Sequence, residues 1–270
     1  MKYTKEDIRQ FKSRGMKSEA VDAQLADFQK GFTPVTLSEP ATVGNGILRI
    51  APEEEERLTA VYEEAGATAD IVKMVPASGS ASRMFKDLFA FADSYRGTVE
   101  EFLELVQQKQ PGSMHDFFLK INELPFYTRL SDIIWKDGKS IERMIEKREF
   151  NEILKYILTK KGLNYGNTPK ALVDFHIYRD FVRTAFDEHL VEGALYAGSG
   201  KKVQIHFTVA EEYLPLFQAR LRKVTKVFEK MFGVKYEVTF SFQKPSTDRV
   251  SVDTDGNLLR DEKGEIVFHP

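Results

Sequence analysis

The segment Ile71-Val-Lys-Met-Val-Pro-Ala-Ser-Gly-Ser-Ala-Ser-Arg-Met-Phe-Lys86 decides the fold that we expect for this chain. It opens with an apolar run, from Ile71 to Val75, that is typical of a short buried strand. Residues 77–82 are all small, and the sequence that follows Arg83 has apolar residues at helical spacing. The order of strand, small-residue turn and helix predicts an α/β fold.

The small-residue turn predicts a binding site for an anion. Where a strand passes into a helix, several backbone N–H groups point to one spot, and the helix N-terminus favours negative charge. Arg83 adds a guanidinium group whose fork geometry suits phosphate. The alternative is an ordinary turn between a strand and a helix, which needs no ligand. The candidate nucleotide-binding residues of the turn are Ala77, Ser78, Gly79, Ser80 and Ser82.

Composition excludes several classes of protein. The chain has 270 residues, a net charge of −2 and 30% charged residues, so it shows no basic excess that would suggest a nucleic-acid partner. It has no cysteine, which excludes disulfides and thiolate metal sites. No apolar run reaches the length of a membrane span, and the N-terminus lacks the core of a signal peptide. We therefore expect a cytoplasmic protein that binds neither nucleic acid nor a membrane. The sequence does not indicate its oligomeric state.

Residues 1–66 are expected to form a helical segment and a connector that pack on the body of the protein. A capping-box-like start at Thr4 opens a helix predicted over residues 4–30. The connector that follows contains prolines and glycines, but it also has too many apolar side chains for a free linker. Pro52 and the four glutamates after it predict a second helix, which ends at about Gly66.

Residues 67–270 are expected to form the α/β domain. Apolar residues at spacings of three and four predict a helical insertion at about 97–161. A helix is also expected over 178–196. Strict alternation predicts strands at 201–209 and 236–242 with a long helix between them, an order that implies a right-handed crossover and parallel strands. The predicted architecture is a Rossmann-like, mostly parallel sheet with helices on both faces.

The motifs of several enzyme classes are absent from the sequence. There is no Gly-x-Ser-x-Gly, no His-x-x-x-His, no Walker A loop and no Rossmann glycine fingerprint. Two candidates remain besides the turn. Lys170 follows a proline, which restricts the backbone and can present the lysine rigidly; the alternative is an ordinary surface lysine. Gln243 follows the strand predicted at 236–242.

On these motifs the chain resembles the UDP-sugar pyrophosphorylases, nucleotidyltransferases that join a nucleoside triphosphate to a sugar 1-phosphate. Their signature is a strand followed by Leu-x-Gly-Gly-x-Gly-Thr-Arg-Leu-Gly, and later a Pro-Lys dipeptide. Residues 76–85 match this signature at Gly79, at Ser82 in place of threonine, and at Arg83. Residues 168–170, Thr-Pro-Lys, supply the dipeptide.

The resemblance extends to Gln243, which is similar to the family's strand-end glutamine that reads the uracil ring. Two of the family's glycines are Ser78 and Ala81 in this chain, which restricts the approach of the backbone to a triphosphate. The chain also resembles, more closely, an uncharacterised bacterial family built around Ala-Ser-Gly-x-x-Ser-Arg-Met and Gln-Lys-x-Ser-Thr-Asp. In the UDP-sugar pyrophosphorylases, a metal-binding aspartate lies further along, in a part that would follow Pro270. The resemblance therefore implies that this chain is an N-terminal portion of a longer protein, without a sheet edge, the metal ligand and the sugar pocket.

The function implied by the resemblance is that of a nucleotidyltransferase-like protein, which binds UTP or a UDP-sugar and transfers the nucleotidyl group to a sugar 1-phosphate. Arg83 and Lys170 are then the candidate catalytic residues: Arg83 would neutralise charge on the phosphates, and Lys170 would hold the phosphate of the sugar. Mg²⁺ is the implied cofactor, with ligands outside this chain. Two alternatives stay open: a non-catalytic module that binds a nucleotide or nucleotide sugar, and an interaction protein that uses its helical insertion.

Overall fold

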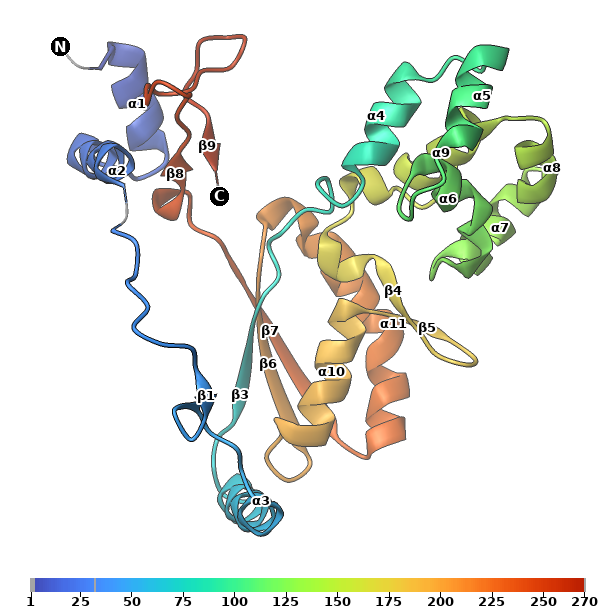
Figure 1. The fold of residues 1–270 in the computed structure, drawn as a ribbon. Helices are drawn as coiled ribbons and strands as arrows, with labels where there is room; N and C mark the ends of the chain where they lie inside the picture. Colours follow the sequence, from blue (N-terminus) through green and yellow to red (C-terminus); the bar gives the residue numbers. More distant parts are fainter. Residues whose placement is uncertain (1–2, 32, 270) are drawn as a thin grey trace. The chain divides into compact units, whose positions relative to one another are not determined.

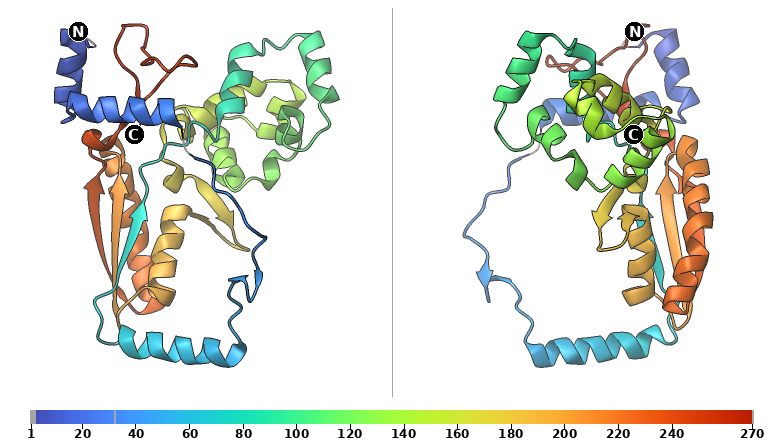
Figure 2. Two further views of the ribbon diagram at one scale, coloured as in Figure 1. Left: turned by 60° about the vertical axis from the view of Figure 1, so that its left-hand side comes forward. Right: turned by 90° about the vertical axis from the view of Figure 1, so that its right-hand side faces the viewer.

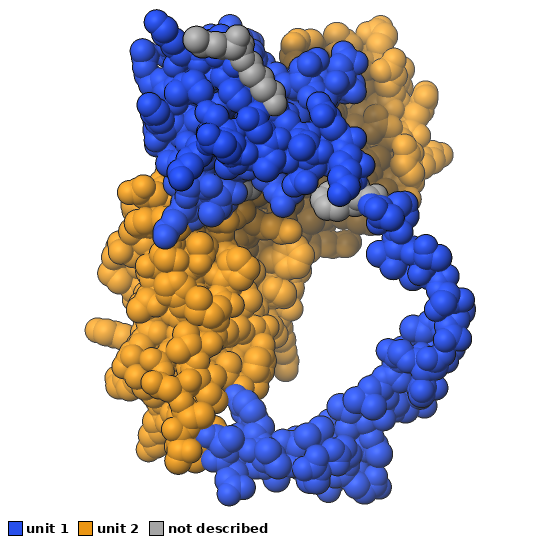
Figure 3. Space-filling view, turned by 90° about the vertical axis from the view of Figure 1, so that its left-hand side faces the viewer, with its two compact units in different colours: residues 1–65, 243–270 blue, residues 66–242 orange. Residues whose placement is uncertain are grey.

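A computed structural model describes residues 3–31 and 33–269 of the chain. The chain divides into two compact units, which Figure 3 shows in different colours: residues 1–65 with 243–270, and residues 66–242. Each unit contains buried apolar clusters of its own. No helix in the described part of the chain is both long and apolar enough to cross a membrane.

The first unit combines N-terminal helices with a C-terminal strand pair. Phe11, Val21 and Leu25 from its first two helices are buried together with Val250 and Ile266 from the C-terminal segment. Its helices and strands are α1 (Lys5–Ser13), α2 (Ser18–Lys30), β1 (Thr42–Val43), β2 (Gly46–Ile47), α3 (Pro52–Gly66), η5 (Pro245–Thr247), β8 (Arg249–Val250) and β9 (Phe268–His269). The helix that begins at Pro52 and ends at Gly66 is confirmed.

Residues 4–30 are mostly helical, as predicted, but they form two helices and not one continuous helix. Thr4 forms the expected capping box, but α1 ends at Ser13 and α2 begins only at Ser18. Gly15 lies in the break with a φ of +71°, a conformation that favours glycine. In one straight helix, the apolar residues of the two halves could not pack against each other. The break instead lets both halves bury their apolar side chains in one cluster.

The connector between α2 and α3 has several exposed apolar side chains. Val35, Leu37 and Leu48 are each more than four-fifths exposed. Apart from the two-residue strands β1 and β2, the described residues of this connector form no regular element. The connector therefore forms no helix or larger sheet that could cover its apolar side chains.

The second unit contains the α/β core and confirms the predicted fold class. Figure 1 shows its strands and helices in chain order, with the helical part as a separate cluster of short helices. Its elements are β3 (Val72–Pro76), α4 (Lys86–Ser94), α5 (Val99–Gln107), α6 (Met114–Leu119), η1 (Ile121–Glu123), α7 (Tyr127–Lys136), α8 (Ile141–Glu146), α9 (Phe150–Leu158), η2 (Tyr165–Asn167), η3 (Lys170–Leu172), β4 (Asp174–Ile177), β5 (Val182–Thr184), α10 (Ala185–Tyr196), β6 (Lys202–Val209), η4 (Glu211–Tyr213), α11 (Leu214–Phe232) and β7 (Lys235–Phe242).

The central sheet has three parallel strands in the order β3-β6-β7. Phe207 in the middle strand pairs with Val75 on one side and with Phe240 on the other. The alternate residues of β6, from Val203 to Val209, are buried in one apolar cluster with residues of α10 and α11. Because all three strands are parallel, their carboxyl ends lie at the same edge of the sheet.

Helices were predicted on both faces of the sheet, but within this unit α10 and α11 pack on one face (Figures 1 and 2). On β3, the side chains that alternate with the buried Val75 are exposed, and Met74 reaches 66% exposure. The strand order explains the arrangement. Both crossovers, from β3 to β6 and from β6 to β7, move in the same direction across the sheet, so right-handed connections place both helices on one side.

The helices predicted over residues 97–161 are present as α5 to α9 and share a large apolar cluster with α4. Thr98 and Glu101 form a capping box at the start of α5. The helix predicted over 178–196 is present as α10, but it starts only at Ala185, later than predicted. The residues before it form the antiparallel hairpin of β4 and β5, in which Ile177 pairs with Val182.

Candidate functional site

The small-residue turn lies at the carboxyl end of β3 and is anchored at both of its ends. The N–H of Ala77 donates to the carbonyl of Thr208 on β6 over 2.7 Å. At the other end, Ala81 and Phe85 are buried, and the Phe85 ring stacks on Tyr165 with centroids 5.5 Å apart. Helix α4 begins at Lys86, later than the sequence predicts. The loop between these anchors is therefore held in place by the fold.

Three backbone donors of the turn are available to a ligand. Within residues 3–31 and 33–269, the amides of Ser78, Gly79 and Ser80 donate no hydrogen bond. The side-chain hydroxyl of Ser80 lies 2.7 Å from that of Ser82. Gly79 has a φ outside the left-handed region, and a Cβ at this position would meet no atom within 4 Å. Unpaired amides beside an open glycine are what the close approach of an anion to the backbone requires.

The structure brings the predicted Pro-Lys dipeptide to this turn. The N–H of Lys170 donates to the carbonyl of Gly79 over 3.0 Å, and Pro169 forms an antiparallel bridge with Ser80. The side chains of Lys170 and Arg83 are both exposed. Two segments that the whole helical insertion separates in the sequence thus become neighbours, and each contributes an exposed cationic side chain.

Gln243, the candidate for reading the base, follows a different strand from the turn. It is the first residue after β7, and β6 lies between β7 and β3 in the sheet. The carboxyl ends of β3 and β7 belong to the same edge of the sheet, but they are two strands apart. The structure brings Lys170 to the turn by hydrogen bonding, and it shows no such bond for Gln243 among the described residues.

The second unit also contains a cavity of about 1140 Å³ that none of the predicted site residues line. Its walls are formed by α7, by the hairpin of β4 and β5, by α11 and by the segment between α9 and η3. Thr168 lies in the wall. Two residues further on, Lys170 makes its hydrogen bond to the turn, so the cavity and the turn are separated by a single short segment.

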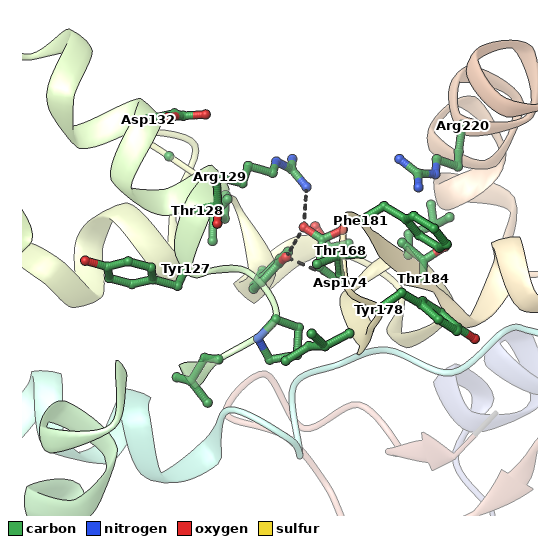
Figure 4. A pocket seen from close by; sticks show the side chains of 18 of the residues that line it. Tyr127, Thr128, Arg129, Asp132, Thr168, Asp174, Tyr178, Phe181, Thr184 and Arg220 are labelled. Carbon is green, nitrogen blue, oxygen red and sulfur yellow. Dashed lines mark hydrogen bonds and ion pairs between the residues drawn. The ribbon is translucent and has the colours of Figure 1, made fainter. Parts of the chain in front are cut away.

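Asp174 is at the polar centre of the cavity (Figure 4). Its buried carboxylate accepts hydrogen bonds from the Tyr165 hydroxyl over 2.9 Å and from Nη1 of Arg129 over 3.1 Å. Burial raises the pKa of the Tyr165 hydroxyl, with a further contribution from the nearby Asp174 carboxylate. Tyr165 therefore remains a neutral donor to Asp174. On another wall, Arg220 is paired with the buried Asp187 at the start of α10.

The sequence does not reveal these cavity residues. Arg129, Asp174 and Arg220 come from three distant segments, and no short motif contains any two of them. Only Asp187 has a local signal, because it follows Thr184 at capping-box spacing. That signal predicts a helix start and says nothing of the arginine that binds the same carboxylate.

Metal ligands do not gather at the turn or at the cavity. Among the described residues, no three histidine or acidic side chains form a group that could hold a metal ion. The phosphate chemistry expected at the turn therefore rests on backbone amides and on Arg83 and Lys170.

Comparison with known proteins identifies a family. A family model described as Domain of unknown function (DUF4301) matches residues 4–270, which is nearly the whole chain. Searches of curated proteins and of solved structures found no match.

Proposed function

The chain belongs to the DUF4301 family, and we propose that it is a nucleotidyltransferase-like protein whose turn at residues 77–83 binds the phosphates of a nucleotide. The proposal concerns UTP or a UDP-sugar as the nucleotide and a sugar 1-phosphate as the acceptor. The hydrogen bond between Lys170 and Gly79 carries it, because this bond supplies a second cation beside a turn that already offers free amides and Arg83.

The position of the turn in the fold supports the proposal. In parallel α/β sheets, ligands bind outside the carboxyl ends of the strands, and the turn follows the carboxyl end of β3. The turn is anchored to the sheet through Ala77 and to the helical part through Phe85. Its donors are thus held in position before a ligand arrives, which reduces the entropy lost on binding.

The reaction that fits these groups is an in-line displacement. A phosphate oxygen of the sugar 1-phosphate attacks the α-phosphorus of the nucleotide, a new P–O bond forms, and the bond to the β-phosphate oxygen breaks. Pyrophosphate leaves with the electron pair of that bond. Arg83 and the turn amides would stabilise the phosphate oxygens, and Lys170 would hold the attacking phosphate. Such a transfer needs positioning and charge, and it requires no covalent nucleophile on the protein.

Mg²⁺ enters this proposal as part of the nucleotide substrate. It prefers six oxygen ligands and often keeps several waters together with phosphate oxygens. Since the described residues gather no metal-binding group, we assign no protein ligand to it. The role proposed for the chain is to hold the phosphates of the Mg²⁺-nucleotide complex.

A second candidate function is binding without catalysis, and Ala81 is the observation that favours it. Where the resembling enzymes have a glycine, the Ala81 side chain is buried in the apolar cluster of the helical part. This position serves packing, so the backbone there is not open to a triphosphate. A turn that contacts fewer phosphate oxygens could hold a nucleotide or nucleotide sugar and leave it unchanged.

The proposal is tested by incubating the chain with Mg²⁺, UTP and a panel of sugar 1-phosphates, and by measuring the release of pyrophosphate. We expect release that Arg83→Ala and Lys170→Ala each reduce at least tenfold, since each removes a charge-assisted contact. Arg222→Ala is the control, because this exposed arginine on α11 belongs to neither the turn nor the cavity. UTP binding without pyrophosphate release would favour the non-catalytic module, and neither binding nor release would contradict both.

A further inference from the structure

The cavity at Asp174 has the chemistry of a site for a neutral polyhydroxylated molecule. We propose that it binds a sugar ring, whose hydroxyl groups are recognised by Asp174, Arg129 and Arg220. Binding of the sugar does not depend on the turn; only its assignment as the acceptor rests on the proposed function. The resemblance implied that the chain lacks a sugar pocket, and this cavity offers one from different segments.

The charge of the cavity favours a neutral ligand over a phosphate group. The described residues that line it include four cationic and four acidic side chains. The two central guanidinium groups are each matched by a buried carboxylate, Arg129 by Asp174 and Arg220 by Asp187. No excess of positive charge remains to offset the desolvation of a phosphate dianion. Hydroxyl groups carry no charge and lose far less hydration on entering such a site.

Arg220 offers donors that the fold holds in place. Its Nε donates to one oxygen of Asp187 over 2.8 Å, and its Nη2 donates to the other. The Asp187 side chain is almost fully buried and is also bound by the N–H of Thr184. Among the described residues, Nη1 of Arg220 has no hydrogen-bond partner. A guanidinium fixed along one edge presents its free N–H groups in a set direction.

Arg129 and Asp174 offer a matching donor and acceptor. Arg129 uses Nη1 for Asp174, while its side chain remains 54% exposed. The side-chain bonds from Arg129 and Tyr165 to Asp174 both end on Oδ2, and Oδ1 accepts no side-chain bond from the described residues. Figure 4 shows Arg129 and Arg220 extending from different walls, with Asp174 between them. A sugar hydroxyl can donate to a carboxylate and accept from a guanidinium at once, and this arrangement supplies both partners.

The size and the remaining walls of the cavity suit a sugar ring. Cavities of several hundred to about 1000 Å³ hold small organic ligands, and this one is of that order. Tyr178 and Phe181, whose rings stack with centroids 4.8 Å apart, belong to the wall and can cover an apolar ring face. Oδ1 of Asn164, another lining residue, is buried and has no hydrogen-bond partner among the described residues.

The test uses methyl α-glycosides of glucose, galactose and mannose as probes, detected by saturation-transfer NMR on the full chain. We expect at least one glycoside to give a saturable signal, and Arg129→Gln to weaken its affinity about tenfold or more, as the loss of a bond to a charged donor does. Arg129 is half-exposed, so the substitution should leave the fold intact. Arg143→Gln, at an exposed position on α8 outside the cavity, is the matched control and should bind as the unchanged chain does.

Three outcomes would overturn the proposal: no saturable signal from any glycoside, a signal that Arg129→Gln leaves unchanged, or binding of inorganic phosphate alone that Arg129→Gln abolishes. The last result would mark the cavity as an anion site. Arg83→Ala separates this test from that of the proposed function, because it should leave glycoside binding unchanged. Glycoside binding without any pyrophosphate release would contradict the proposed reaction and leave the sugar site standing.

Discussion

The backbone N–H of Lys170 donates to the carbonyl oxygen of Gly79 over 3.0 Å, and this bond joins the two segments that carry the candidate phosphate-binding groups. Gly79 itself serves no visible structural purpose. Its φ lies outside the left-handed region, and a Cβ would meet no atom within 4 Å. Under the proposed function, the absence of a side chain at this position lets a ligand approach the backbone closely.

Gly79→Ala is accordingly expected to leave stability within about 0.5 kcal/mol of the unchanged chain, as surface substitutions do. The same substitution should weaken the binding of Mg²⁺-UTP, because the added methyl group occupies the space above the free amides. Thermal unfolding and calorimetric titration measure the two effects. Gly193→Ala is the contrasting variant: its Cβ would lie 2.7 Å from Val203, so it should cost about 1–3 kcal/mol of stability. Unchanged affinity in Gly79→Ala would contradict the role given to this glycine.

The helical part of the second unit should depend on its own apolar cluster. Leu154 on α9 is fully buried in that cluster, whereas Leu119 at the end of α6 is 67% exposed. Leu154→Ala should lower the free energy of unfolding by about 2–5 kcal/mol, because it leaves a cavity among packed side chains. Leu119→Ala should change it by less than about 0.5 kcal/mol. Equal effects in denaturant titrations of the two variants would show that this cluster does not stabilise the fold.

The first unit should lose stability in acid through Asp7. The Arg260 guanidinium, with the backbone and hydroxyl of Thr4, lowers the pKa of this buried carboxyl to about 2 from its ordinary 3.8. A depressed pKa in the folded state contributes stability above the unfolded pKa, and that stability is lost as the pH falls from about 4 towards 2. The loss is on the order of 2 kcal/mol.

Hydrogen exchange of the α1 amides, followed between pH 6 and pH 2, measures this effect after correction for the intrinsic exchange rate. Asp7→Asn should weaken protection at pH 6 and remove most of its decrease in acid. The control is Glu6→Gln, an exposed neighbour that pairs with Arg9 on the surface, which should change protection little. A decrease of the same size in Asp7→Asn and in the unchanged chain would assign the acid sensitivity to other groups.

Local signals in the sequence predicted much of the fold. The capping boxes at Thr4 and Thr98 and the alternation in β6 depend on residues within a few positions of each other, and the structure contains them all. The predictions that were wrong have different causes. The break at Gly15 serves a cluster that includes residues of the C-terminal segment, which local periodicity does not reveal. The helix predicted over 178–196 extended over β5, although the pairing of β5 with β4 is local.

The candidate site residues also divide into those that a local sequence pattern indicates and those that only the fold brings together. The turn was visible because its small residues and Arg83 are contiguous, and Lys170 because a proline precedes it. The cavity was not, since Arg129, Asp174 and Arg220 meet only when α7, β4 and α11 are packed together. The placement of α10 and α11 on one face of the sheet follows from the strand order, which the sequence pattern did not determine.

Calorimetric titration of Mg²⁺-UDP-glucose into the unchanged chain, Arg83→Ala, Lys170→Ala and the double variant tests the central claim most directly. If Arg83 holds the nucleotide phosphate and Lys170 the sugar phosphate of one bound UDP-sugar, each single substitution should weaken binding about tenfold to a hundredfold. The double variant should then lose less than the sum of the two free-energy changes, because the second substitution acts on a ligand that has already lost its position. Saturable binding that neither substitution weakens, or no binding of Mg²⁺-UDP-glucose to the unchanged chain, would contradict the claim that the turn and Lys170 form one phosphate site.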